Sequence, residues 1–287
     1  MGAAAATAES WPAPAKLNLF LHVLGRRPDG YHELQTAFQF VDLCDQLRFE
    51  ARDDPRIVRT AGPVEVAPEE DLVVRAAEAL RRATGTRLGV SIALEKRIPI
   101  GGGLGGGSSD AATTLVALDR IWQTGLKREE LAAIGLELGA DVPVFVHGKA
   151  ALAAGVGEQL TPIEPPVSDV VIVFPGVGVS TAEVFQAPEL TRNSAAITIR
   201  ALFEGGGRND CEAVVRSRYP VVAQALDWLG QFGRARMTGT GACVFVAVES
   251  HARAAEICRK VPPAWRGFAC RGLNRSPLNE RLGAGVG

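Results

Sequence analysis

A run of glycines in the middle of the chain is the segment best suited to chemistry. Gly101-Gly102-Gly103-Leu104-Gly105-Gly106-Gly107 holds six glycines in seven positions, with Pro99-Ile100 before it and Ser108-Ser109 after it. Glycine exposes backbone N–H groups and adopts φ values that other residues resist. Ahead of a helix, these N–H groups and the helix dipole favour phosphate. The residues therefore predict a polyphosphate-binding loop, and a hinge or packing loop is the alternative.

Two common nucleotide motifs match this loop only in part. The glycines satisfy G-x-G-x-x-G, but the acidic residue that a dinucleotide fold needs near the next strand is missing, since Asp119 falls inside the predicted helix. Gly107-Ser108-Ser109 fits the end of a Walker loop except that serine replaces the lysine. Because phosphoryl transfer requires charge neutralisation, the cation has to come from elsewhere in the chain or from Mg²⁺.

Two charged residues elsewhere are candidates for that chemistry. Lys16 lies beside the first predicted strand, and Asp141 follows the second helix after the loop. Taken alone, each has a structural explanation. Lys16 is then a solvated strand end, and Asp141 is an N-cap before Val142-Pro143.

The elements that position these residues follow from periodicity and punctuation. Alternating apolar residues predict strands over 16–24 and 88–94, and Asp71 and Gly85 bracket a helix between them. The glycine loop leads into a helix capped by Ser108, Ser109 or Asp110. Further strands are expected near 38–41, 47–50, 144–146, 150–153, 170–174 and 244–248, and further helices near 128–138, 210–215 and 221–232. A second glycine loop spans 238–241, and the end from Gly272 is expected to be a loose tail.

Composition limits the classes of function. At 287 residues the chain is long enough for about two domains, and its 47% hydrophobic and 22% charged residues are typical of a globular protein. A net charge of −1 predicts neither a nucleic-acid partner nor a membrane surface. Five cysteines without a C-x-x-C pair, and four histidines without a ligand spacing, predict reduced thiols and no protein metal site. We expect a cytoplasmic protein that handles small molecules.

Together these segments resemble the GHMP kinase superfamily, which includes galacto-, homoserine, mevalonate and phosphomevalonate kinases. The resemblance covers nearly the whole chain and rests on PAKLNLFLHVLGRRPDGYHEL, PIGGGLGGGSSDAA (99–112), LGADVPVFVHG (138–148), FPGVGVSTAEVF (174–185), NDCE (209–212) and TGTGACVF (238–245). The glycine loop alone is general to the superfamily. The A-K-L-N-L, D-G-Y-H and G-A-D-V-P segments are more specific, and they resemble a branch whose substrate carries a cytidine diphosphate on the non-mevalonate route to isoprenoid precursors.

The resemblance implies an ATP-dependent kinase that phosphorylates a hydroxyl of that small-molecule substrate. It implies that the ATP phosphates are bound by Pro99, Ile100, Gly101, Gly102, Gly103, Leu104, Gly105, Gly106, Gly107, Ser108 and Ser109. It makes Asp141 the general base and Lys16 its partner. The implied substrate-binding residues are Asn18, Tyr31, His32 and Phe185, with Tyr31 and Phe185 covering the two faces of a cytosine. Mg²⁺ is expected mainly on the nucleotide phosphates.

The fold that the resemblance implies is α+β, with two domains and the substrates between them. An N-terminal ATP-binding domain like ribosomal protein S5 domain 2 would span 1–164, and a ferredoxin-like C-terminal domain would span 165–287. A monomer or weak homodimer is expected. Two alternatives stay open, which are another GHMP small-molecule kinase and a catalytically silent nucleotide-binding module. The second glycine loop either contacts ligand or only packs.

Overall fold

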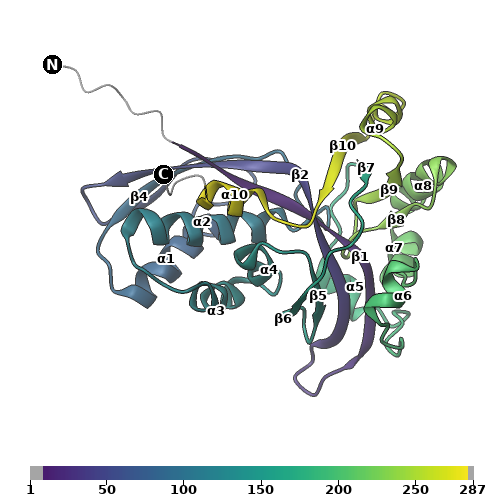
Figure 1. Cartoon of the computed structure of the whole chain (residues 1–287), viewed down its shortest axis with the longest axis horizontal. Coiled ribbons are helices and arrows are strands. Elements are labelled where there is room, and N and C mark those ends of the chain that lie inside the picture. The colour runs from purple at the N-terminus through teal and green to yellow at the C-terminus, as the bar shows by residue number, and fades with distance from the viewer. Residues whose placement is uncertain (1–8, 284–287) are drawn as a thin grey trace.

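Two long antiparallel strands connect the two halves of the molecule. The computed structural model describes residues 9–283. β1 (Ser10–Arg26) and β2 (His32–Arg52) pair with Lys16 opposite Phe40 and Asn18 opposite Phe38. The register of this pair shifts between Pro14 and Lys16 and again after Asn18, and such bulges bend a strand. Figure 1 shows both strands passing from one half of the molecule into the other.

The remaining strands join β1 and β2 in one mixed sheet, and helices pack on it. The strands are β3 (Ile57–Ala61), β4 (Gly89–Glu95), β5 (Ala151–Ala154), β6 (Gln159–Pro162), β7 (Asp169–Phe174), β8 (Arg236–Met237), β9 (Val244–Val248) and β10 (Arg266–Leu273). The helices are α1 (Leu72–Thr84), α2 (Gly106–Trp122), α3 (Arg128–Leu138), α4 (Val142–His147), α5 (Thr181–Gln186), α6 (Ile199–Phe203), α7 (Glu212–Arg218), α8 (Pro220–Leu229), the 3₁₀ turn η1 (Gly230–Phe232), α9 (His251–Cys258) and α10 (Pro277–Gly283). The hydrogen-bonded strands run in the order β3-β4-β2-β10-β7-β9-β8, with β1 and β5 also on β2 and β6 on β5.

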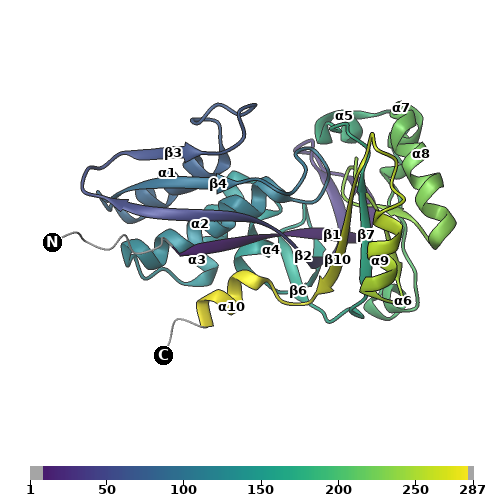
Figure 2. The same ribbon diagram turned by 90° about the horizontal axis from the view of Figure 1, so that it is seen from above.

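Each half buries its own apolar core. In the first half, α1, α2, α3 and α4 pack together beside β1, β2 and β4, and α2 is buried along most of its length. In the second half, α7, α8 and α9 pack on β7 and β9. Figure 2 shows the two helical layers at opposite ends of the molecule, with the long strands between them.

Local signals account for several element ends. Asp71 caps α1 by accepting the N–H of Val73 at 3.1 Å, and Gly85 ends that helix in the left-handed conformation. The predicted helix over 128–138 and the strands over 88–94, 170–174 and 244–248 are confirmed within a residue. The two extended stretches at 38–41 and 47–50 belong to the single strand β2.

Three predictions about the elements are wrong. Residues 144–146 are helical in α4 instead of a strand, because Val142–His147 is buried on nearly all sides and short apolar runs do not distinguish the two. The end of the chain from Gly272 is not a loose tail, since β10 continues to Leu273 and Leu278 of α10 is 1% exposed. Helix α2 begins at Gly106 with Gly105 as its N-cap residue, so Ser108, Ser109 and Asp110 lie inside the helix and none of them is its cap.

The division into 1–164 and 165–287 stays a prediction. The sheet is continuous between the halves, because β10 pairs with β7 along Arg266–Arg271 and with β2 at Gly272 and Leu273. All five cysteines are free thiols. Within residues 9–283 no helix has both the length and the apolar character required to cross a bilayer.

Candidate active site

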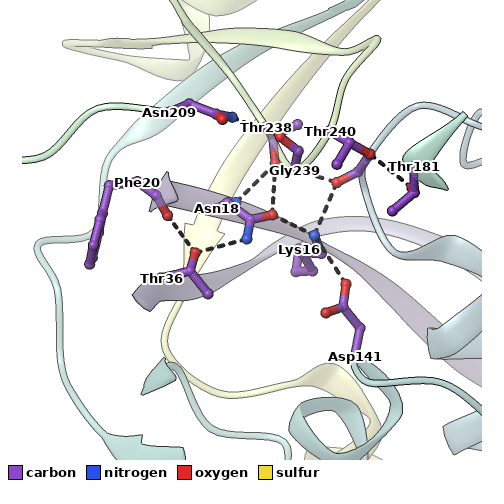
Figure 3. Close-up of polar contacts among 11 residues, drawn as sticks. Lys16, Asn18, Phe20, Thr36, Asp141, Thr181, Asn209, Thr238, Gly239 and Thr240 are labelled. Carbon is purple, nitrogen blue, oxygen red and sulfur yellow. Dashed lines mark hydrogen bonds and ion pairs between the residues drawn. The ribbon is translucent and has the colours of Figure 1, made fainter. Parts of the chain in front are cut away.

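Lys16 is the centre of a buried polar cluster on β1. Its ammonium Nζ lies 2.5 Å from Asn18 Oδ1, 3.1 Å from the carbonyl oxygen of Gly103 and 3.3 Å from Asp141 Oδ2. The Lys16 side chain is only 4% exposed, so these three oxygens replace water around the charge. Lys16 and Asn18 share one face of β1 because strand side chains alternate. Figure 3 shows the ammonium between Asn18 and Asp141.

Asp141 reaches this cluster from the other side. It directly precedes α4, but its side chain does not cap that helix. The carboxylate faces Lys16 instead and remains 33% exposed, so one of the pair is buried and the other is open to a ligand. The structure thus brings Lys16, Asn18 and Asp141 together from two segments that lie more than a hundred residues apart in the sequence.

The first glycine loop passes directly over Lys16. The Lys16 N–H donates to the carbonyl of Leu104 at 3.0 Å, and a Cβ on Gly105 would lie 3.0 Å from Lys16 Cε and 2.9 Å from the Phe145 ring. Gly105 also has a φ of 72°, which favours glycine. Helix α2 begins one residue later, so its free N–H groups lie at the same place.

The second glycine loop packs against the first. A Cβ on Gly103 would lie 2.3 Å from the carbonyl oxygen of Thr238, and the N–H of Cys243 donates to the carbonyl of Gly102 at 3.0 Å. Thr238 Oγ1 accepts the backbone N–H of Asn18 at 2.9 Å, so this loop also touches β1. The second glycine loop therefore packs against the first loop and β1, and its contact with a ligand stays a prediction.

Asn209 holds the second loop in place. Its amide Nδ2 donates to the carbonyls of Met237 at 3.0 Å and Gly239 at 2.7 Å, which fixes the backbone next to Thr238. Thr240 and Thr181 exchange a hydrogen bond of 2.9 Å that connects the loop to the start of α5. Figure 3 shows this group of threonines and Asn209 next to Lys16 and Asn18.

A cavity of about 510 Å³ lies between the two halves. Its lining includes Lys16, Asn18, Asp141, Phe185, Gly239, Thr240 and the loop from Pro99 to Ser108. Of the residues that the resemblance assigned, Ser109 lies beneath this surface and is fully buried, with no hydrogen-bond partner for its hydroxyl. Tyr31 and His32 are not in the lining either.

His32 and Phe185 meet at one end of the site. Their rings stack with centroids 5.1 Å apart and an interplanar angle of 25°. Tyr31 is 66% exposed in the turn between β1 and β2, and it does not share the ring contact. Burial lowers the pKa of His32, and the positive charges of Arg192 and Arg26 lower it further. His32 is therefore a neutral ring near pH 7.

Sequence reasoning missed a lysine beneath the phosphate loop. Lys96 Nζ lies 2.5 Å from Asp45 Oδ2 and 2.6 Å from Asp110 Oδ2, and it would lie 2.9 Å from a Cβ on Gly106. Lys96 and Lys16 are the two positively charged side chains in the cavity lining. The only signal in the sequence is that Lys96-Arg97 directly precedes Ile98-Pro99, which is too general a pattern to assign.

Asp110 has a different role from the helix cap predicted for it. Its side chain is buried against Lys96 and Asp45, and its Oδ1 has no hydrogen-bond partner. Burial raises the pKa of Asp110 to about 8, and the nearby carboxylate of Asp45 adds to the effect of burial. Asp45 Oδ1 accepts the N–H groups of Arg97 and Ile98.

The comparisons with known proteins agree with this architecture. The chain matches the GHMP kinases N terminal domain over residues 71–149 and the GHMP kinases C terminal domain over residues 187–266. A solved mevalonate kinase has the same fold, with a TM-score of 0.67 and 16% identity over 93% of this chain and 100% of that one. The α+β, two-domain GHMP kinase fold is therefore confirmed.

Closer relatives narrow the family. The 4-diphosphocytidyl-2-C-methyl-D-erythritol kinase of Alkalilimnicola ehrlichii is 59% identical over 95% of this chain and 94% of its own length. The enzyme of the same name from Halorhodospira halophila is 58% identical, with 95% and 96% covered. A crystal structure of 4-(cytidine 5'-diphospho)-2C-methyl-D-erythritol kinase is 35% identical, with a TM-score of 0.81 over 92% of this chain and 99% of that one. The chain belongs to the GHMP kinases and, within them, to the 4-diphosphocytidyl-2-C-methyl-D-erythritol kinase family.

Proposed function

We propose that the chain transfers the γ-phosphate of ATP to the 2-hydroxyl of 4-diphosphocytidyl-2-C-methyl-D-erythritol, giving the 2-phosphate and ADP. The observation that carries this proposal is the Lys16–Asp141 pair at 3.3 Å in a cavity lined by a glycine loop. The family supplies the substrate, and the geometry supplies the groups that the transfer requires. This activity belongs to the formation of isoprenoid precursors by the non-mevalonate route.

Asp141 orients the acceptor hydroxyl and takes its proton. Its carboxylate is partly exposed to the cavity, whereas the Lys16 ammonium that holds it is buried. A strong base is not required, because a loose phosphoryl-transfer transition state leaves proton removal late. Lys16 stabilises the charge on the transferred group, and its bonds to Asn18 Oδ1 and the Gly103 carbonyl keep its position fixed.

The loop from Pro99 to Ser109 provides the nucleotide end of the site. Gly106 and Gly107 open α2 with unpaired N–H groups at the positive end of its dipole, which is an arrangement suited to polyphosphate. When bound, Mg²⁺ neutralises phosphate charge, and we propose that the nucleotide phosphates hold it. Within residues 9–283 no three carboxylate, histidine or cysteine side chains gather into a cage for a metal ion.

A coupled ADP-release assay tests the proposed function. Purified protein with ATP and 4-diphosphocytidyl-2-C-methyl-D-erythritol should release ADP, whereas mevalonate and homoserine in its place should not. Release with mevalonate or homoserine instead would support another GHMP kinase. Nucleotide binding without turnover on any of the three would support a silent binding module. Size-exclusion chromatography with light scattering tests the expected monomer or weak homodimer.

A further inference from the structure

The ladder between β1 and β2 skips two residues, Leu19 and Phe20, directly after Asn18. A bulge of this kind leaves backbone groups that need other partners, because buried carbonyls are costly when unpaired. The carbonyl of Leu19 accepts a hydrogen bond from Arg236 Nη1 at 2.9 Å. The carbonyl of Phe20 accepts one from the hydroxyl of Thr36 on β2. Side chains therefore hold the bulge that follows Asn18.

The bond to Phe20 determines what the Thr36 hydroxyl does on its other side. A carbonyl only accepts, so Thr36 gives its single hydrogen to Phe20. Its oxygen is left as an acceptor, and it accepts from Asn18 Nδ2 at 2.9 Å. Thr36 is 2% exposed and Asn18 is 4% exposed, so these bonds are shielded from solvent. Figure 3 shows Thr36 between the amide of Asn18 and the carbonyl of Phe20.

Lys16 requires the same orientation of the Asn18 amide from the opposite end. An ammonium only donates, so the atom that faces it has to accept, and Asn18 Oδ1 lies 2.5 Å from Lys16 Nζ. A reversed amide would turn its NH₂ group toward a cation and its oxygen toward a hydroxyl whose hydrogen is already used. We propose that Thr36 is a positioning residue, which fixes Asn18 with Oδ1 toward Lys16 and so holds the ammonium beside Asp141.

The consequence for phosphoryl transfer rests on the proposed function. Asn18 Oδ1 and the Gly103 carbonyl are the two uncharged oxygens that hold the Lys16 ammonium. A cation that is fixed before the reaction stabilises developing charge without reorganising. Thr36 also belongs to the cavity lining, so a direct contact with substrate is the competing explanation. Loss of positioning lowers kcat, whereas loss of a substrate contact that is equal in the ground and transition states raises KM.

Steady-state kinetics of three variants separate these explanations. Thr36→Val keeps the shape of the side chain without its hydroxyl, and it should lower kcat by about 10- to 100-fold with little change in either KM, since small displacements at a reacting centre have effects of this size. Thr36→Ser keeps the hydroxyl and should restore most of kcat. Thr113→Val is the matched control. Thr113 is equally buried, and its hydroxyl donates to the carbonyl of Pro12, also on β1, at 3.4 Å. Its kcat should stay at the wild-type level.

NMR of full-length protein labelled with nitrogen-15 asparagine tests the orientation without requiring turnover. In the wild type, nuclear Overhauser contacts from the Asn18 amide hydrogens should be stronger to the Thr36 side chain than to the Lys16 Cε hydrogens. The same hydrogens should exchange slowly with water, because a buried and bonded amide is protected. Exchange should be faster in Thr36→Val and should stay slow in Thr36→Ser.

The two measurements can contradict the inference separately. Amide hydrogens that lie closer to Lys16 than to Thr36 in the wild type would overturn it. So would a Thr36→Val variant with wild-type kcat, a variant whose main defect is a raised KM, or a loss of kcat that Thr36→Ser does not restore. Wild-type protein with the expected amide orientation but no turnover of the cytidyl substrate would instead overturn the proposed function.

Discussion

At the scale of single residues, the site depends on one ion pair in which Lys16 is buried and Asp141 is partly exposed. Lys16 is enclosed by oxygens of Asn18, Gly103 and Asp141, whereas the Asp141 carboxylate opens toward the cavity. Removing one partner therefore does not have the same effect as removing the other. Without Asp141 the ammonium keeps two oxygens, but without Lys16 three acceptors lose their donor.

We expect Asp141→Asn and Lys16→Met each to lower kcat by about 100-fold or more, because each removes a group that moves or stabilises charge in the transition state. Asp141→Asn should keep the wild-type affinity for ATP, since the glycine loop is a separate part of the site. Steady-state kinetics and calorimetry with an unreactive ATP analogue measure the two effects. Near-normal turnover in either variant would remove that residue from the mechanism.

A second prediction at this scale concerns the buried Asp110. In the folded protein its pKa is raised to about 8, whereas in an unfolded chain the carboxyl is ionised above about pH 4. Between these values the folded state binds the extra proton, so this group lowers stability as the pH rises toward 8. Asp110→Asn removes that dependence and still leaves Lys96 paired with Asp45. The melting temperature of Asp110→Asn, relative to that of the wild type, should rise between pH 5 and pH 8.5. If the two melting temperatures change in parallel with pH instead, Asp110 does not hold a proton in the folded state.

At the scale of elements, the two glycine loops act as one unit. Gly103 has a φ of 76°, and its missing Cβ is the space that the carbonyl of Thr238 occupies. A substitution there affects folding as well as the phosphate site. Gly106 differs, because its Cβ would first meet the flexible end of Lys96 and the side chain of Ile98.

Gly103→Ala should therefore lower the free energy of unfolding by about 1–3 kcal/mol, the range for a strained backbone position. Gly106→Ala should cost less stability than Gly103→Ala and should mainly weaken ATP binding through the displaced Lys96. Urea unfolding of the apo protein, followed by nucleotide titration, separates the two effects. Equal stability of the two variants would show that the loops do not depend on their close approach.

The last helix gives a further test at this scale. Leu278 is 1% exposed and packs in the core of the first half, although α10 comes at the end of the chain. Leu278→Ala should cost about 2–5 kcal/mol, as a buried leucine usually does. Val64→Ala, at a position that is 92% exposed, should stay within about 0.5 kcal/mol of the wild type. A small effect of Leu278→Ala in urea unfolding would mean that α10 adds little to this core.

At the scale of the whole molecule, the site exists because two halves meet. The phosphate loop and Asp141 come from the first half, Phe185 and Thr240 come from the second, and β1 carries Lys16 and Asn18 between them. The base end of the proposed substrate site depends on this meeting, since His32 belongs to β2 and Phe185 to α5.

Tyr31→Ala and Phe185→Ala should raise KM for the cytidyl substrate by roughly 5- to 150-fold, because stacking on a base contributes about 1–3 kcal/mol. Phe185→Ala should have the larger effect, since it also removes the ring that supports His32. Affinity for ATP should not change. Calorimetry with CDP checks the prediction, and variants that bind CDP as well as the wild type would remove the aromatic residues from the base site.

Local signals in the sequence determined the elements that depend on neighbours along the chain. The alternation in 16–24, the Asp71 cap and Gly85 stop of α1, and the glycine loop before α2 all arise from interactions within a few residues, and each is present in the fold. The motifs at Lys16, the glycine loop and Asp141 also sufficed for the family.

Only the tertiary structure decided which of these residues meet. Apolar residues 144–146 are helical because they are buried between other helices, and the segment after Gly272 is ordered because β10 and α10 return to the first half. The Lys96 group with Asp45 and Asp110, and the Arg192 contact with His32, join residues between 14 and 160 positions apart. Sequence spacing carries no record of such contacts, because burial and hydrogen bonding depend on distance in space and not on distance along the chain.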